Sequence, residues 1–174
     1  MSPLLGLILL VGLTVASPAA KDVQRFEYLG SLQVPSTQPG RQFEEHRYYA
    51  SAFSGIWQAA IQDCQDTFGP NGHLVSIESE AEASGLNEWI ERRGSGGSSF
   101  WTSGQYVITS TTWMWASVFG SPLSYTAWME GEPTQFPNGR HRISLVHVNQ
   151  FSAGWKATLD SETMRYVCEF HVQP

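Results

Sequence analysis

The chain has 174 residues, a formal net charge of −6 at pH 7 and two cysteines. This length predicts a single domain. The 10 Lys and Arg residues form no basic cluster, and proteins bind phosphate groups through clustered positive charge. Nucleic acids and anionic membrane surfaces are therefore excluded as expected partners.

The first 20 residues have the pattern of a secretory signal peptide. They contain no charged side chain, and an apolar run at residues 4–15 is followed by small residues. We expect cleavage near residues 16–20, a mature chain that begins near Lys21, and a secreted, extracellular protein. The alternative is an uncleaved anchor, although the run is shorter than the roughly 20 residues of a membrane span. No other segment is expected to span a membrane.

Two strands are expected before the first helix. Residues 26–32 form the first strand, and residues 46–53, which contain three aromatic side chains, form the second. Turn-forming residues at 35–40 predict a loop between them.

A first helix is expected at residues 54–68. Apolar residues recur there at the i, i+3, i+4 and i+7 spacing of one helix face. Ser54 is the expected N-cap, and Gly-Pro-Asn-Gly at residues 69–72 ends the helix. The residues of the apolar face are Trp57, Ala60, Ile61 and Cys64.

A short strand at residues 74–77 leads to a second helix. Ser79 and Glu82 have the spacing of a capping box, which closes a helix N-terminus. We expect the helix to end near Arg93, before a flexible Gly/Ser loop at residues 94–99. The residues of its buried face are Leu86, Trp89 and Ile90.

The chain from Phe100 onward shows no helical periodicity. Aromatic clusters alternate with turns, and two late strands are expected at residues 142–148 and 165–172. Two early helices followed by short strands and loops indicate an α+β domain.

A set of landmarks in a fixed order is more specific than any one of these elements. The landmarks are Trp57-x-x-Ala60-x-x-x-Cys64, Leu74-Val75-Ser76-Ile77-Glu78-Ser79-x-x-Glu82, Phe100-Trp101-Thr102-Ser103-Gly104, Trp113-Met114-Trp115, Tyr125-x-x-Trp128-x-x-Gly131-Glu132-Pro133 and Tyr166-Val167-Cys168-Glu169. Together they resemble the C-type lectin-like fold over about residues 43–170. The resemblance implies two helices with short antiparallel sheets and a long loop region. The Trp-Thr-Ser-Gly variant at residues 101–104 is similar to secreted arthropod members of the family.

The resemblance also divides the chain and pairs its cysteines. We assign residues 43–174 to the C-type lectin-like domain and residues 21–42 to an N-terminal extension. Cys64 and Cys168 would form the outer disulfide of the family, and closing so long a loop stabilises a fold by about 4–5 kcal/mol in the chain-entropy model. Two free buried thiols are the alternative.

The family's second, inner disulfide has no cysteines here. By motif spacing its two positions fall near Arg142 and Asp160. We hypothesise that these two residues form a salt bridge in its place. Two unrelated surface charges are the alternative.

The calcium-dependent sugar site of the family is also altered. Sugar-binding members use a Glu-Pro-Asn or Gln-Pro-Asp motif and a Trp-Asn-Asp motif, because Ca²⁺ takes 6–8 oxygen ligands. Here the motifs read Glu132-Pro133-Thr134 and Trp155-Lys156-Ala157. An ammonium replaces one ligand and a methyl group another, so we expect no calcium, no other metal and no cofactor. Whether the peptide bond before Pro133 is cis stays open.

Other chemistry has weaker support. His141 and His147 are the conceivable metal pair, but no cysteine or paired carboxylate completes a ligand set. No strand–turn–helix nucleophile motif surrounds a serine, so we expect no enzyme activity. The seven tryptophans are expected to pack in the core before they stack on a ligand.

The resemblance implies a secreted recognition module in innate immunity. Its expected partner is a glycan or glycoprotein on a microbe or cell surface, bound by the long loop at about residues 126–142. A protein partner is the alternative, and a matrix role or an inactive relic stays open. The candidate ligand-binding residues are Glu132, Thr134, Gln135, Phe136, Asn138 and Arg140.

Overall fold

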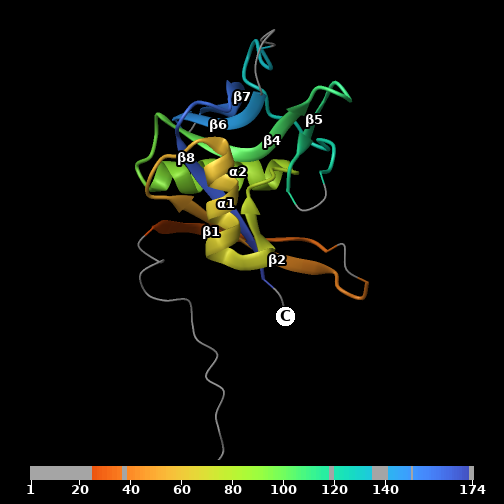
Figure 1. Ribbon diagram of the computed structural model, residues 1–174. Coiled ribbons are helices and arrows are strands. Elements are labelled where there is room, and N and C mark those ends of the chain that lie inside the picture. The colour runs from red at the N-terminus through yellow and green to blue at the C-terminus, as the bar shows by residue number, and fades with distance from the viewer. Residues whose placement is uncertain (1–24, 37–38, 118–119, 135–140, 150, 173–174) are drawn as a thin grey trace, which may run out of the picture.

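The computed structural model describes residues 25–36, 39–117, 120–134, 141–149 and 151–172 (Figure 1). The predicted signal peptide at residues 1–20 lies outside this part of the chain. Within it, neither helix has the length and apolar character that a membrane span requires.

The described strands form one sheet around two helices, which confirms the α+β class. The sheet order is β1-β2-β8-β4-β6-β7, with β3 paired to β8 and β5 paired to β4. Figure 1 shows the helices α1 and α2 between the β1–β2 pair at one end and the β6–β7 pair at the other. The strands are β1 (Phe26–Pro35), β2 (Phe43–Ser51), β3 (Gly72–Leu74), β4 (Ser98–Val107), β5 (Thr112–Trp115), β6 (His141–Asn149), β7 (Ser152–Leu159) and β8 (Arg165–His171).

Helix α1 (Trp57–Phe68) buries three of the four residues of the predicted face, with Ile61 half-buried, but it begins later than predicted. Ser54 is not its N-cap, because that position belongs to Ile56, which makes no side-chain cap. The backbone of Gly55 is instead paired with Met164 through hydrogen bonds of 3.0 and 3.2 Å. This bridge holds the chain extended before the helix. The helix ends at Gly69, whose φ of 70° favours glycine.

Helix α2 (Glu80–Arg92) begins at the predicted capping box. The N–H of Glu82 donates to Ser79 Oγ at 3.2 Å. The Glu82 carboxylate accepts from the Ser79 hydroxyl at 3.1 Å and from the N–H of Glu78 at 2.9 Å. Four polar groups at this helix end therefore find partners. The face formed by Leu86, Trp89 and Ile90 is buried as predicted.

Strand β1 lies within the residues assigned to the N-terminal extension and is part of the same sheet. It pairs with β2 from Phe26 opposite Ser51 to Pro35 opposite Phe43. A Cβ atom at Gly30 would lie 2.3 Å from the Trp89 ring, so only glycine allows this approach of β1 to α2. Residues 26–35 thus contribute to the core of the domain.

Three further strands, β4, β5 and β7, lie in the part of the chain for which we expected short strands and loops without assigning their bounds. In β4, the consecutive residues Phe100 and Trp101 are both buried, so the strand lacks the polar alternation that identifies a half-exposed strand. The strand predicted at residues 74–77 lies earlier in the chain, because β3 covers Gly72–Leu74 and residues 75–77 are not in a strand. Val75 still donates one hydrogen bond to Val167 O at 2.9 Å.

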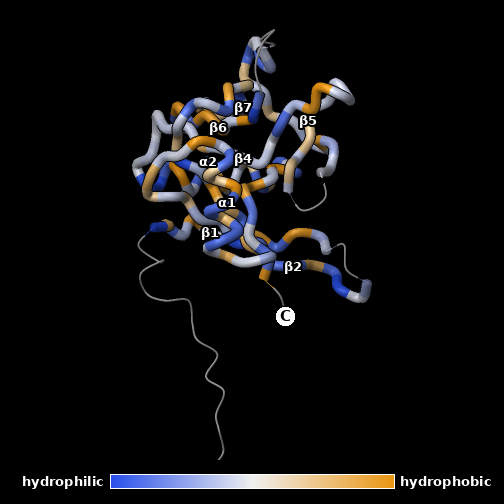
Figure 2. The backbone as a smooth tube through the Cα atoms, viewed as in Figure 1, coloured by the Kyte–Doolittle hydropathy of each residue, from blue (hydrophilic) through white to orange (hydrophobic). Residues whose placement is uncertain are grey.

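The core lies between the helices and the sheet, and a disulfide crosses it. Figure 2 shows hydrophobic stretches near the centre of the molecule, around α1, α2 and β4. Cys64 on α1 and Cys168 on β8 are both fully buried and bonded, with 5.5 Å between their Cα atoms. The predicted pairing is confirmed. The bond joins the first helix to the last strand.

Candidate ligand-binding site

Backbone hydrogen bonds join the described part of the long loop to β7. The N–H of Trp155 donates to Ala127 O at 2.7 Å, and the N–H of Met129 donates to Trp155 O at 3.0 Å. A Cβ atom at Gly154 would lie 2.9 Å from Ala127 O, so the approach is close. The loop segment before Pro133 therefore has a fixed position at the β6–β7 end of the molecule (Figure 1).

Aromatic rings connect this loop to the core. Trp155 is fully buried, and its ring centroid lies 5.6 Å from that of Trp128. Trp113 lies 5.0 Å from Trp128 and 5.3 Å from Tyr106. Tyr106, Trp113 and Trp128 are half-buried, and we call these three residues the aromatic row.

The prediction that the tryptophans pack in the core holds for most of them. Only Trp113 and Trp128 are half-buried rather than buried. Burial raises the pKa of the neighbouring Tyr125 phenol, and the Glu80 carboxylate raises it further, so Tyr125 stays a neutral hydroxyl. The buried tryptophans are Trp57, Trp89, Trp101, Trp115 and Trp155.

Glu132 uses its carboxylate to hold the loop against β7. Its Oε2 atom accepts the N–H of Thr134 at 2.6 Å and the N–H of Ala157 at 3.1 Å. Its own N–H donates to Met129 O at 3.0 Å. The bond between Glu132 and Pro133 is cis. The side chain of Thr134 is exposed.

Comparison with known proteins identifies the family to which this domain belongs. A model of the Lectin C-type domain matches residues 54–170. The chain belongs to the C-type lectin family. Lithostathine-1 of Mus musculus is 27% identical over 163 residues, which are 94% of each chain. Regenerating islet-derived protein 3-gamma of the same species is 30% identical over 136 residues, which are 75% of this chain and 74% of that one.

A solved structure of a relative supports the same conclusion. The crystal structure of human lithostathine matches with a TM-score of 0.64 and 26% identity, covering 79% of this chain and 92% of that one. The C-type lectin fold predicted from the sequence is thereby confirmed. The likeness to secreted arthropod members stays a prediction.

The two motifs that supply calcium ligands in sugar-binding C-type lectins are altered in this chain, at residues 132–134 and 155–157. Among the described residues of the two motifs, the side-chain oxygens are the Glu132 carboxylate and the Thr134 hydroxyl, and one carboxylate oxygen already accepts two N–H groups. Lys156 is exposed between the buried Trp155 and Ala157. It therefore leaves β7 on the face opposite to theirs. The described residues of the two motifs thus offer three side-chain oxygens, and Ca²⁺ takes 6–8 oxygen ligands in all.

Only two of the six candidate ligand-binding residues can be placed. Glu132 and Thr134 lie next to each other across the cis bond, joined by the hydrogen bond described above. The other candidates lie outside the described residues, and their role stays a prediction. They are Gln135, Phe136, Asn138 and Arg140.

Arg142 and Asp160 form the salt bridge that we hypothesised for this lectin. Arg142 Nη2 lies 3.5 Å from Asp160 Oδ2. The guanidinium also lies 3.8 Å above the ring of Trp57 and donates to Gln105 Oε1 at 3.1 Å. The alternative of two unrelated surface charges is wrong, because the Arg142 side chain is only 9% exposed.

The histidine pair considered from the sequence does not form a site. His141 begins β6 and His147 lies six residues further along it, a distance of about 20 Å in an extended strand. The histidines that do converge are His46, His73 and His171, from three different strands. The sequence did not predict this cluster, because it does not show which residues of β2, β3 and β8 lie opposite one another.

Proposed function

We propose that this protein is a secreted, non-enzymatic recognition domain that binds a glycan or glycoprotein on a microbe or cell surface without calcium. The observation that carries the proposal is the position of Glu132. Its carboxylate fastens the loop to β7 through the N–H groups of Thr134 and Ala157. Hydrogen bonds to an ionised carboxylate are short and strong. They can therefore hold the loop against β7 in place of the calcium ion that holds it in sugar-binding family members.

Loss of ligand oxygens is the main reason to expect no calcium. Ala157 has no side-chain oxygen, and a calcium ion at Glu132 Oε2 would compete with two N–H donors. Repulsion from the Lys156 ammonium contributes little, because this side chain points to the other face of β7. We therefore attribute the expected absence of calcium from this loop to missing ligand oxygens.

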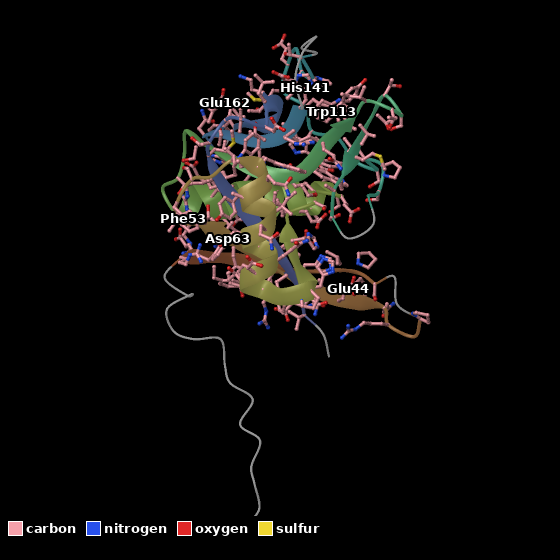
Figure 3. The ribbon with its side chains drawn as sticks, in the orientation of Figure 1. Glu44, Phe53, Asp63, Trp113, His141 and Glu162 are labelled. Atoms are coloured by element: carbon pink, nitrogen blue, oxygen red, sulfur yellow. A yellow bond between two sulfur atoms is a disulfide. The ribbon has the colours of Figure 1, made fainter. Side chains whose placement is uncertain are left out.

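A sugar ring has both a polar edge and apolar C–H faces, and this end of the molecule offers groups for both. The half-buried aromatic row presents ring surface beside the loop. The exposed Thr134 hydroxyl can donate and accept hydrogen bonds. Figure 3 shows Trp113 and His141 at this same end.

Secretion is supported by two independent features. The first 20 residues have the pattern of a signal peptide, and the Cys64–Cys168 disulfide requires an oxidising compartment. A role in innate immunity is the biological setting that we propose for such a recognition module.

The aromatic row also favours a second candidate function, which is binding of a protein. Tyrosine and tryptophan are enriched among the residues that carry most of the binding energy in protein interfaces. A secreted inhibitor or a receptor-type ligand would use the same surface.

Binding to a glycan array, with Ca²⁺ and with EDTA, tests the proposal. We expect binding that is the same in both conditions and is reduced at least tenfold by Trp113→Ala. Trp113→Phe, which keeps an aromatic face, is the matched control and should retain most of the binding. Loss of binding in EDTA contradicts the calcium-free mechanism. An empty array together with saturable binding of a purified protein selects the second candidate.

A further inference from the structure

A cluster of histidines and carboxylates lies on one face of the sheet, away from the ligand loop. His46 on β2 is opposite His171 on β8, and His73 on β3 is opposite Glu169 on β8. Directly opposed residues share a face, and so do residues two apart on one strand. The three neighbouring strands therefore direct all four side chains to the same place.

The cluster is distinct from the candidate ligand-binding site. Glu44 lies at its edge, with Oε1 3.3 Å from His46 Nε2. Figure 3 shows Glu44 at one end of the molecule and Trp113 and His141 at the other. A ligand bound here would not touch the long loop.

We propose that His73, Glu169 and His171 form a binding site for a zinc ion. The two Nε2 atoms of His73 and His171 lie 3.0 Å apart, and His171 Nε2 lies 3.3 Å from Glu169 Oε1. Ligand atoms on a tetrahedral zinc ion, with bonds of about 2.0–2.2 Å, lie about 3.3 Å from one another. Three protein ligands leave the fourth position for water.

Hydrogen bonds to neighbouring groups orient the proposed ligand atoms of His73 and Glu169 toward the zinc site. His73 Nδ1 lies 2.8 Å from Leu74 O, and because a carbonyl oxygen only accepts, Nδ1 carries the proton and Nε2 carries a lone pair. Zinc-binding histidines usually have such a second hydrogen bond. Glu169 Oε2 accepts the N–H of Ser76 at 3.1 Å, so Oε1 is the oxygen directed to the site.

His46 acts on the site through Glu169 and is a positioning residue. Its Nδ1 atom lies 2.6 Å from Glu169 Oε1. Its ring stacks on that of His171, with centroids 3.8 Å apart and planes within 10°. The Glu44 carboxylate on its other side fixes the ring orientation.

Burial and donor type select the kind of ion. The side chains of His73 and Glu169 are 8% and 3% exposed, whereas that of His171 is 35% exposed, so an ion enters beside His171. A buried carboxylate requires a compensating positive charge. Two imidazoles with one carboxylate suit zinc and related transition metals, whereas Ca²⁺ and Mg²⁺ require mainly oxygen ligands.

Calorimetric titration of the untagged, folded chain with Zn²⁺ tests the proposal. We expect the titration to show one zinc ion bound per chain. The same titration with Ca²⁺ should show no binding heat. His171→Gln, chosen because the side chain is partly exposed, and His73→Gln should each weaken zinc binding at least tenfold. His141→Gln, at the other end of the molecule, is the matched control and should bind zinc normally.

Cobalt substitution separates ligands from positioning residues. Co²⁺ in this site should show the strong visible absorption of a tetrahedral complex, and His171→Gln should change that spectrum. His46→Gln should keep the spectrum but weaken binding by about 10–100-fold. Far-ultraviolet circular dichroism establishes that each variant is folded. Less than one zinc per folded chain, or unchanged affinity in folded His171→Gln and His73→Gln, overturns the proposal.

Discussion

The guanidinium of Arg142 lies 3.5 Å from the carboxylate of Asp160 and 3.8 Å above the ring of Trp57. By motif spacing, C-type lectins usually carry an inner disulfide at the positions of these two charges. Arg142 is the second residue of β6, and Asp160 directly follows β7, so the pair joins the same two strands that the disulfide would join. A noncovalent contact thus occupies the place of a covalent one.

Asp160→Asn should destabilise the fold by only about 0–1 kcal/mol, since the Asp160 side chain is 32% exposed and the pair is partly screened. Asp160→Lys should cost more, because it places a second positive charge beside the buried Arg142. Urea unfolding at pH 7 measures the free energy of unfolding of both variants.

Arg142→Met should cost more than Asp160→Asn, about 1–3 kcal/mol, because it also removes the cation–π contact with Trp57 and the hydrogen bond to Gln105. The double reversal Arg142→Asp/Asp160→Arg should recover part of the loss of either single reversal. Equal damage from all three reversal variants shows that the two charges do not interact.

Glu132 can be tested separately from any ligand. Glu132→Ala leaves the N–H groups of Thr134 and Ala157 without their carboxylate acceptor, so we expect a loss of about 2 kcal/mol. Glu132→Gln keeps an acceptor oxygen without the charge and should cost about half as much. Thermal unfolding measures both changes, and equal stability of all three proteins contradicts a role of Glu132 in fastening the loop.

The proposed loss of calcium binding predicts that the site can be restored. The triple change Thr134→Asn, Lys156→Asn and Ala157→Asp supplies two new oxygen-bearing side chains beside Glu132, at residues 134 and 157, and removes the Lys156 ammonium. We expect the melting temperature of this variant to rise with Ca²⁺, because an ion that binds only the folded state stabilises it. The unchanged protein should show no such rise up to about 1 mM Ca²⁺, the weak end of extracellular calcium sites.

Lys156→Asn alone is the control for this experiment. It removes the ammonium but places its amide on the opposite face of β7, so it should not create calcium binding. A calcium-dependent rise in the unchanged protein overturns the ion-free mechanism. A rise in the single variant shows that the ammonium, and not the missing oxygens, prevents binding.

The sequence predicted those features that follow from a local motif or from the family resemblance. The capping box of Ser79 and Glu82, the apolar face of α1 and the disulfide implied by the family resemblance all agree with the structure. The Arg142–Asp160 pair followed from the same alignment. Each of these rests on a motif that is read directly along the chain.

Features that depend on distant pairing were not predictable in this way. Ser54 has the right residue type for an N-cap, but pairing of Gly55 with Met164 keeps it outside the helix. The His46, His73 and Glu169 side chains meet only because β8 lies between β2 and β3. No periodicity in the sequence predicts this order of strands in the sheet.

Alkaline pH should weaken the fold through Tyr166. Burial raises the pKa of this phenol, and its hydrogen bond to Asp63 Oδ2 at 2.5 Å raises it further. The folded pKa lies above the value of about 10 in an unfolded chain, so the folded state retains the proton more tightly. The stability that this group contributes is therefore complete below about pH 10 and is lost as the pH rises toward the folded pKa.

Tyr166→Phe is the variant that isolates this effect. It keeps the aromatic contacts of the ring with Phe26 and Phe53 but has no proton to lose. We expect it to be less stable than the unchanged protein at pH 8, because Asp63 keeps only its ion pair with Arg25. Between pH 8 and pH 10.5 its urea midpoint should fall less steeply. Parallel slopes for the two proteins would show that Tyr166 ionisation does not drive the alkaline loss, since every other titrating group is common to both.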